Sequence, residues 1–177
     1  MIKSLNALTA IAVCLSGCSS VGQIPTAKLA SGTFHTANGA PAGTVVVLAA
    51  GDDITINVAV LGLATGTHGM HLHTVGSCDA PSFASASGHL NPHAMQHGTS
   101  NPAGSHLGDL PNLVVDNRGV GTVSAKLRDG RSAAEAALFD TDGTTIVIHA
   151  DPDDYKTDPS GNSGARIACA VLKPTAG

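Results

Sequence analysis

The sequence predicts an all-β fold, a Greek-key sandwich or flattened barrel with two long functional loops. Several short stretches alternate apolar and polar residues, which is the period of a half-buried strand. Turn signals such as Asn-Gly and Asp-Gly separate these stretches, and the chain holds 21 glycines and 9 prolines among 177 residues. No window has a convincing helical period, and residues 132–138 come nearest. Short strands at this spacing are typical of sandwiches and barrels.

The clearest strand begins at Ile54, where apolar residues occupy every second position up to Val60. Four further strands are predicted at residues 44–48, 121–127, 144–149 and 167–172. Two segments interrupt this rhythm, residues 74–111 and 150–165, and both are rich in Gly, Pro, Ser, Asp and His. Loops of this length in a compact domain usually carry function.

The composition limits the classes of protein that the chain can represent. With 42% hydrophobic and 12% charged residues, it has enough apolar side chains for a core. The formal net charge is −4 and no basic stripe occurs, which argues against a nucleic-acid partner.

Residues 1–17 have the pattern of a secretory signal peptide: one positive charge at Lys3, then an apolar stretch too short to span a bilayer. The stretch ends in Leu-Ser-Gly-Cys, which resembles the lipobox of bacterial lipoproteins. This resemblance implies cleavage before Cys18 and a diacylglycerol on its thiol. Residues 18–30 are predicted to form a flexible tether, and residues 31–177 the folded domain. A soluble secreted protein, cut a few residues later, is the alternative.

The protein is therefore expected at the bacterial cell envelope, exported and anchored to a membrane by lipid, facing the periplasm or the exterior. Because Cys14 would leave with the signal peptide and Cys18 would carry lipid, one pair of cysteines remains. In an oxidising compartment, Cys78 and Cys169 are expected to form a disulfide.

Histidine stands out in the composition, because nine occur and six of them fall between His68 and His97. His71 and His73 are two residues apart on a short strand, so their side chains share a face and can bind one ion. The long loop that follows, and the end of a later strand, add further candidates: His89, His93, His97, His106, Asp109 and His149. Imidazoles suit copper and zinc, and a carboxylate among imidazoles suits zinc.

Five segments resemble the copper/zinc superoxide dismutases of the bacterial exported type: GTHGMHLHTVGSC, GHLNPHAMQHG, SHLGDLPNL, IHADPDDY and GNSGARIACAVL. They occur in the family's order between about Ser31 and Leu172. The resemblance implies a copper bound by His71, His73, His89 and His149. It implies a zinc bound by His89, His97, His106 and Asp109, so that His89 bridges the two ions.

The same resemblance implies roles for residues beyond the ligands. Asp153 would join a copper ligand to a zinc ligand by hydrogen bonds, with Asp154 as the other candidate. Arg166 would hold the substrate anion at the rim of the copper channel, and His89 would store a proton for the second half-reaction. His68 is expected to be structural, while His93 and His35 lie outside the implied ligand sets. The segment of residues 85–88, just before His89, has serine where the family commonly has a second glycine.

The implied function is disproportionation of superoxide to dioxygen and hydrogen peroxide by a redox-cycling copper with a structural zinc. Homodimers occur among exported members of the family, so self-association is a further expectation. A net charge of about −5 after loss of Lys3 would repel the substrate, so any attraction must be local. The alternative is an envelope protein that buffers or carries copper and zinc without turnover.

Overall fold

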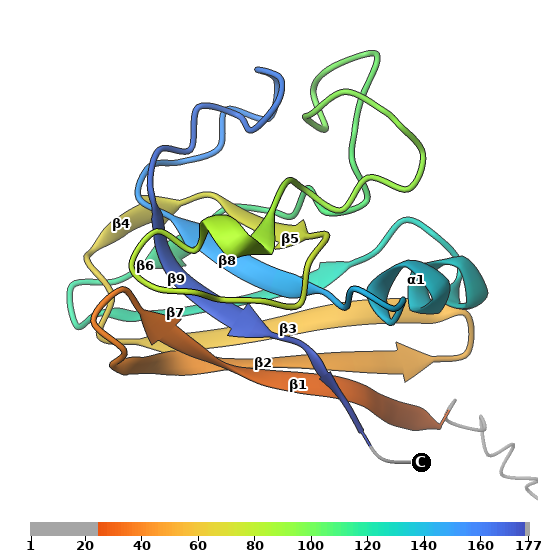
Figure 1. Cartoon of the computed structure of the whole chain (residues 1–177), viewed down its shortest axis with the longest axis horizontal. Coiled ribbons are helices and arrows are strands. Elements are labelled where there is room, and N and C mark those ends of the chain that lie inside the picture. Colours follow the sequence, from red (N-terminus) through yellow and green to blue (C-terminus); the bar gives the residue numbers. More distant parts are fainter. Residues whose placement is uncertain (1–24, 176–177) are drawn as a thin grey trace, which may run out of the picture.

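The computed structural model describes residues 25–175, which form one antiparallel sheet that curves into a nearly closed barrel (Figure 1). Within these residues the strand order is β4-β6-β7-β3-β2-β1-β9-β8-β5, and β10 pairs with β1. The strands are β1 Thr26–Thr36, β2 Pro41–Ala50, β3 Asp53–Leu61, β4 Gly66–His68, β5 Met70–His73, β6 Leu113–Val115, β7 Val120–Lys126, β8 Thr145–His149, β9 Arg166–Val171 and β10 Lys173–Pro174. Two short helices complete the set, η1 Ala84–Ala86 and α1 Arg131–Leu138. The predicted all-β class is confirmed.

The barrel closes through a single residue. β4 and β5 lie at opposite ends of the strand order, yet only Gly69 separates them in the chain. The Gly69 N–H donates to the Asp151 carbonyl, and the Gly69 carbonyl accepts from the His149 N–H, both at 2.8 Å. A Cβ at Gly69 would lie 2.7 Å from Ser163 Oγ, so this junction needs glycine. The path of the chain therefore joins the two edges of the sheet next to the histidine-rich strand β5.

The core is aliphatic and follows the alternation of the strands. On β3, Ile54, Ile56, Val58 and Val60 are all buried, as the sequence pattern predicts. On β2 the buried residues Val45 and Val47 face them across the paired register. The two segments predicted as long loops connect β5 to β6 and β8 to β9. They leave opposite ends of the antiparallel pair β5–β8, and parts of both extend above these strands in Figure 1.

The structure differs from the prediction at one strand boundary and in one helix. The tether was expected to reach Ala30, but β1 begins at Thr26, whose partner in β2 is Ala50. Backbone pairing does not require apolar side chains, so a small, polar segment can still extend a sheet. The weak helical period of residues 132–138 does form a helix, α1, because Ala134 and Leu138 place one face in the core.

The signal peptide, Cys18 and the first part of the tether lie outside the described residues. Within residues 25–175, no helix is long and apolar enough to cross a membrane.

Candidate metal centre

The loop after β5 returns twice to the open edge of this strand. The Leu90 N–H donates to the Leu72 carbonyl at 2.8 Å, and the Leu72 N–H donates to the Gly108 carbonyl at 2.9 Å. These contacts pair His73 with His89 and His71 with Asp109. A Cβ at Gly108 would lie 2.4 Å from the Leu72 carbonyl oxygen, so the close approach depends on glycine.

The first group of converging side chains, here called the copper set, contains four imidazoles whose ligand atoms lie within 4.8 Å of one another: His71, His73, His89 and His149. One nitrogen of each ring is buried and has no hydrogen-bond partner within residues 25–175: His71 Nδ1, His73 Nε2, His89 Nε2 and His149 Nε2. Unpaired buried nitrogens are costly, and a bound metal ion would satisfy all of them. The donor set therefore fits a copper ion.

The second group, here called the zinc set, contains His89, His97, His106 and Asp109. Asp109 Oδ1 lies 2.9 Å from His97 Nδ1, 3.1 Å from His89 Nδ1 and 3.2 Å from His106 Nδ1. Ligands at about 2.0–2.1 Å from a tetrahedral zinc ion are separated by about 3.3 Å, so this spacing fits zinc. The other carboxylate oxygen, Oδ2, accepts the N–H groups of Gly98 at 2.8 Å and His106 at 2.9 Å.

The two sets share one residue and are joined by another. His89 directs Nε2 to the copper set and Nδ1 to the zinc set. Asp153 lies 2.8 Å from His71 Nε2 and 3.0 Å from His97 Nε2, one oxygen to each ring. Asp154 instead accepts hydrogen bonds within its own loop, from Thr157 and Asn162 among others. Of the two candidate carboxylates, Asp153 is therefore the one between the metal sets.

The comparison with known proteins agrees with this geometry. Residues 41–172 match the family model described as copper/zinc superoxide dismutase. The chain belongs to this family. It is 40% identical to the Cu-Zn superoxide dismutase of Caulobacter vibrioides, over 81% of this chain and 85% of that protein. It is 47% identical to Cu-Zn superoxide dismutase 1 of Aquifex aeolicus over 58% of this chain, an alignment that spans only 62% of the Aquifex protein.

Solved structures show the same fold. A superoxide dismutase-like protein from Bacillus subtilis superposes with a TM-score of 0.75 at 34% identity, over 83% of this chain and 100% of that one. The Cu/Zn superoxide dismutase from Brucella abortus gives a TM-score of 0.61 at 25% identity, over 84% of this chain and 100% of that one.

Asn112, which orients Asp153, was not singled out from the sequence of this family member. Asn112 donates through Nδ2 to the Asp153 carbonyl and accepts the Asp153 N–H at Oδ1, both at 2.9 Å. The amide thus holds both sides of the Asp153 main chain. Asn112 does lie in one of the five matched segments, SHLGDLPNL, so its position gave a signal, whereas its partner could not be read from the sequence.

Burial keeps three members of the copper set of this dismutase fold, His73, His89 and His149, in the neutral form that binds metal. Burial lowers the pKa of His73 to about 2, that of His149 to about 3 and that of His89 to about 4, and neighbouring imidazoles lower them further. His97 differs, because hydrogen bonds to Asp109 and Asp153 outweigh burial and raise its pKa to about 9. Hydrogen bonds from histidines likewise outweigh burial and hold the pKa of Asp109 and Asp153 well below the usual range.

These pKa values predict how the stability of the metal-free chain depends on pH. His73, His89 and His149 stay neutral in the folded chain, whereas in the unfolded chain they take up protons near pH 6.5. Unfolding then binds up to about three protons, so the free energy of unfolding should fall as the pH decreases from about 6.5 to about 4. His97 acts in the opposite sense, because its stabilising contribution is lost as the pH rises through about 9.

Urea unfolding of the metal-free chain between about pH 4.5 and 9 measures this dependence. The expected maximum of stability lies near pH 7, where the folded and unfolded chains bind equal numbers of protons on these four histidines. A free energy of unfolding that stays constant between pH 6.5 and 4.5 would contradict the assignment of these buried histidines as neutral.

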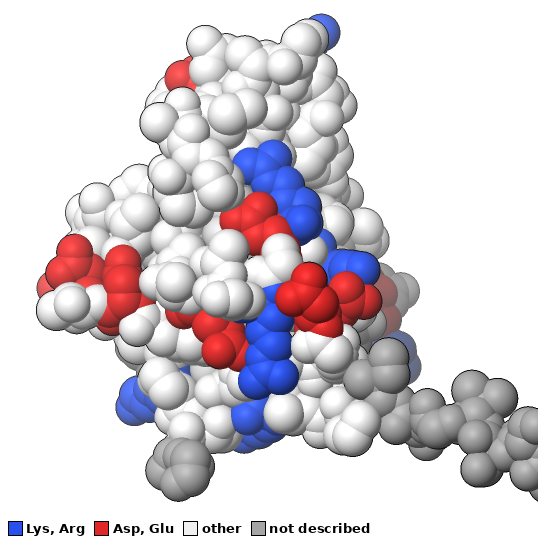
Figure 2. All heavy atoms as spheres, turned by 90° about the vertical axis from the view of Figure 1, so that its right-hand side faces the viewer, with Lys and Arg blue, Asp and Glu red and all other residues white. Residues whose placement is uncertain are grey.

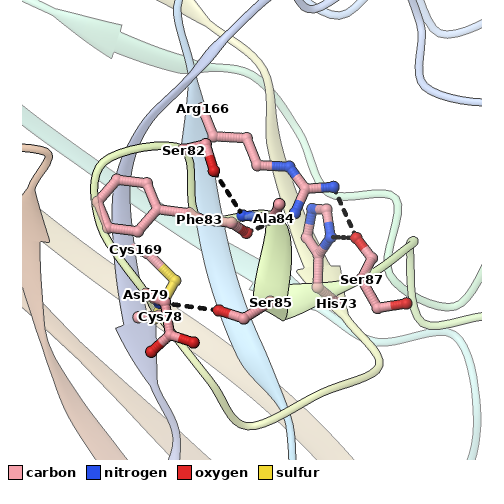
Figure 3. Close-up of a disulfide and its surroundings, with 10 residues drawn as sticks. All are labelled: His73, Cys78, Asp79, Ser82, Phe83, Ala84, Ser85, Ser87, Arg166 and Cys169. Carbon is pink, nitrogen blue, oxygen red and sulfur yellow. Dashed lines mark hydrogen bonds between the residues drawn. A yellow bond between two sulfur atoms is a disulfide. The ribbon is translucent and has the colours of Figure 1, made fainter.

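The predicted disulfide is confirmed and lies beside Arg166 (Figure 3). Cys78 and Cys169 are 91 residues apart and joined by a 2.03 Å S–S bond. The Arg166 guanidinium donates to the Phe83 carbonyl at 2.7 Å and to the Ser87 carbonyl at 2.6 Å. His73 Nδ1 also bonds the Ser87 carbonyl, at 2.9 Å. One carbonyl oxygen thus fixes both a copper-set imidazole and the arginine.

Ser87 adopts a backbone conformation that favours glycine, with φ 66° and ψ −147°. We expect Ser87→Gly to raise the free energy of unfolding by about 1 kcal/mol, because relief of strain exceeds the added entropy of the unfolded chain. Urea unfolding of the metal-loaded protein tests this value. The carbonyl contacts should persist, so a loss of bound copper in Ser87→Gly would show that the serine side chain itself is needed.

The remaining histidines lie outside both metal sets. The buried ring of His68 bonds the His149 carbonyl at 2.8 Å and the Ala64 carbonyl at 3.0 Å, which fits the predicted structural role. His93 is about half exposed and lies 2.7 Å from Asp129. His35 is exposed on β1.

Proposed function

We propose that this chain disproportionates superoxide to dioxygen and hydrogen peroxide at a copper ion beside a structural zinc ion. His71, His73, His89 and His149 would hold copper, and His89, His97, His106 and Asp109 would hold zinc. The convergence of buried ring nitrogens without protein partners carries this proposal. When bound, copper supplies the one-electron oxidation and reduction, and zinc supplies a fixed positive charge.

Arg166 would bind the substrate anion. Its guanidinium stays charged and has five N–H donors. Two of its nitrogens donate to the Phe83 and Ser87 carbonyls, which fixes the plane of the group. Arg166 lines a surface hollow of about 700 Å³ together with Ser87 and Gly88, and its remaining donors are available there for a small anion.

His89 and Asp153 would serve the reaction in different ways. Nδ1 of His89 belongs to the zinc set and lies 3.1 Å from Asp109 Oδ1, which fixes the orientation of the ring. Its Nε2 would then be placed to carry a proton toward the substrate. Asp153 keeps the rings of His71 and His97 in place. With four protein ligands, the zinc set has no open position for a reacting water, which supports a structural role.

The net charge of −4 would repel superoxide, so any attraction must be local. On the face seen in Figure 2, Lys and Arg side chains are interspersed with Asp and Glu and form no continuous basic surface. The acidic loop between β8 and β9 contains one lysine, Lys156. Attraction would therefore depend on Arg166, Lys156 and the bound metal ions.

The test loads the full chain with copper and zinc, then measures superoxide removal by pulse radiolysis together with the metal content. Superoxide dismutases are among the enzymes known to approach the diffusion limit, so we expect about 10⁸–10⁹ M⁻¹s⁻¹. Arg166→Gln should lower the rate about tenfold at unchanged copper content. The matched control is Arg118→Gln, an exposed arginine paired with Asp116. One copper and one zinc bound per chain without turnover would favour the metal buffer or carrier.

The proposed location is the bacterial envelope, through a lipid on Cys18. Relatives include the extracellular superoxide dismutases of Caenorhabditis elegans and Haemonchus contortus, and a disulfide is typical of oxidising compartments. Cys18→Ala should release the expressed protein from the membrane fraction and abolish incorporation of labelled fatty acid. Retention of the label in this variant would place the anchor elsewhere. The homodimer stays a prediction, which sedimentation of the metal-loaded protein would test.

A further inference from the structure

One ring nitrogen among the proposed metal ligands lacks the partner that its counterparts have. His71 and His97 bond Asp153 through the nitrogen that faces away from the metal sets. The corresponding nitrogens of His73 and His149 bond the carbonyls of Ser87 and Gly164. His89 uses both nitrogens in the metal sets. His106 directs Nδ1 to the zinc set, but within residues 25–175 its Nε2 has no acceptor.

This difference has a chemical consequence. A metal-bound imidazole normally donates its second N–H to a carboxylate, a carbonyl or water, and that acceptor orients the ring and raises its basicity. If His106 binds zinc through Nδ1, its hydrogen is on Nε2. The residue is 7% exposed, and its Nε2 is not one of the fully buried ring nitrogens without a partner, so water or a ligand can reach this atom.

His106 lines a cavity of about 290 Å³ between the loop after β5 and strand β7. Its lining includes three leucines, Leu107, Leu110 and Leu127, and two cationic side chains, Lys126 and Arg128. Asp109 is the only carboxylate in the lining given by the described residues, and both of its oxygens already have partners in the zinc set or the main chain. The cavity therefore offers hydrogen-bond donors, positive charge and an apolar wall, and among the described residues its lining holds no free carboxylate.

Both cations can act on a ligand. Arg128 donates to Ser105 Oγ at 2.9 Å and also to the Ser105 carbonyl, and its Nε lies 3.9 Å from Asp129 Oδ1. One N–H on each terminal nitrogen of the guanidinium is left for a ligand. Lys126 pairs with Asp53 at 2.7 Å, but both side chains are more than half exposed, so this pair is weak and the ammonium group can turn.

We propose that this cavity binds a small carboxylate with an apolar group. Its carboxylate accepts the His106 Nε2–H and lies in the field of Lys126 and Arg128, while its apolar part contacts the leucines. The volume is at the lower end of ligand cavities, which fits a single ring or a short branched chain. The inference rests on the proposed zinc assignment of His106. The cavity shares no lining residue with the hollow that contains Arg166.

Occupancy of this cavity should affect zinc binding. A carboxylate on Nε2 makes His106 a stronger ligand, so the bound anion should slow the release of zinc. By thermodynamic reciprocity, zinc should strengthen binding of the anion by the same factor.

The probe is benzoate, which is titrated into the full chain loaded with copper(I) and zinc, with the disulfide intact. Binding is followed by NMR of the methyl groups and the histidines. We expect saturable shifts of the Leu107, Leu110 and Leu127 methyl groups and a downfield shift of the His106 Nε2 proton. Benzamide, which has the same shape without the charge, should bind at least about tenfold more weakly. Lys126→Gln should weaken benzoate binding about threefold to tenfold, whereas Arg118→Gln should leave it unchanged.

Results that contradict the cavity site can be told apart from results that contradict the proposed function. Equal affinity for benzamide, an unchanged affinity in Lys126→Gln, or shifts confined to residues around Arg166 would overturn the site. Metal content and the rate of superoxide removal are measured on the same samples. A zinc-loaded, active chain that leaves benzoate unbound contradicts this inference alone, whereas a chain that binds no zinc contradicts the proposed function and, with it, this site.

Discussion

Replacing His149 by alanine is expected to lower the rate of superoxide removal on the order of a thousandfold or more. His149 ends β8, is buried, and directs Nε2 to the copper set, where it has no hydrogen-bond partner among residues 25–175. Alanine leaves three imidazoles to hold the ion that carries out the reaction. Zinc content should stay near one per chain, because the zinc set does not include His149. Pulse radiolysis combined with elemental analysis measures both quantities.

The matched control for this experiment is His93→Ala. His93 is about half exposed, pairs with Asp129 and lies outside both metal sets, although the sequence places it in the same cluster of histidines. The control should keep both metals and the full rate. If His149→Ala kept the rate of the unmodified chain, the copper assignment would fail. If it lost zinc together with copper, the two sites would not be separable as proposed.

Replacing both cysteines of the disulfide by serine should lower the free energy of unfolding by about 4.5 kcal/mol. The bond joins residues 91 positions apart, and the chain-entropy model gives about this value for such a loop. The loop that it fixes also supplies the Phe83 and Ser87 carbonyls that hold Arg166, so the rate of superoxide removal should fall as well. Urea unfolding of the metal-free Cys78→Ser/Cys169→Ser chain separates stability from metal binding.

Reduction of the unmodified chain provides the comparison. It should reproduce most of the loss seen in the double variant, because both treatments remove the same cross-link without altering the core. A loss below about 1 kcal/mol in both cases would show that the barrel restrains this loop by other contacts.

The sequence predicted the strands that have clear alternation and missed those that do not. Apolar residues at every second position predicted the strand that became β3, because one face of it is buried in the barrel. β4, β6 and β10 are two to three residues long, which is too short for any period to be visible. β1 extends further toward the N-terminus than expected, since its first residues pair through the backbone with β2 and their side chains show no alternation of apolar and polar types.

The candidate site shows the same division. Residue types, the two-residue spacing of His71 and His73, and the resemblance of five segments to one family were enough to predict both metal sets and the disulfide. The contacts that orient these residues come from segments far apart in the chain: Asn112 on Asp153, and the Ser87 carbonyl shared by His73 and Arg166. A backbone carbonyl such as that of Ser87 leaves no mark on the type of residue, and the partner of the Asn112 amide is decided only by the folded chain.

By itself, the sequence determined the chemistry available to this protein, because imidazole and carboxylate side chains in this order favour copper and zinc. Only the tertiary structure decided which ring nitrogen faces a metal set and which one meets an acceptor. It also decided that the hydrogen bonds of His106 within the described residues involve Nδ1 and not Nε2. The physical reason is that a hydrogen bond or a metal bond depends on distances of about 3 Å or less between atoms. Those distances are fixed where the loop after β5 meets the edge of this strand, through packing that no local pattern encodes.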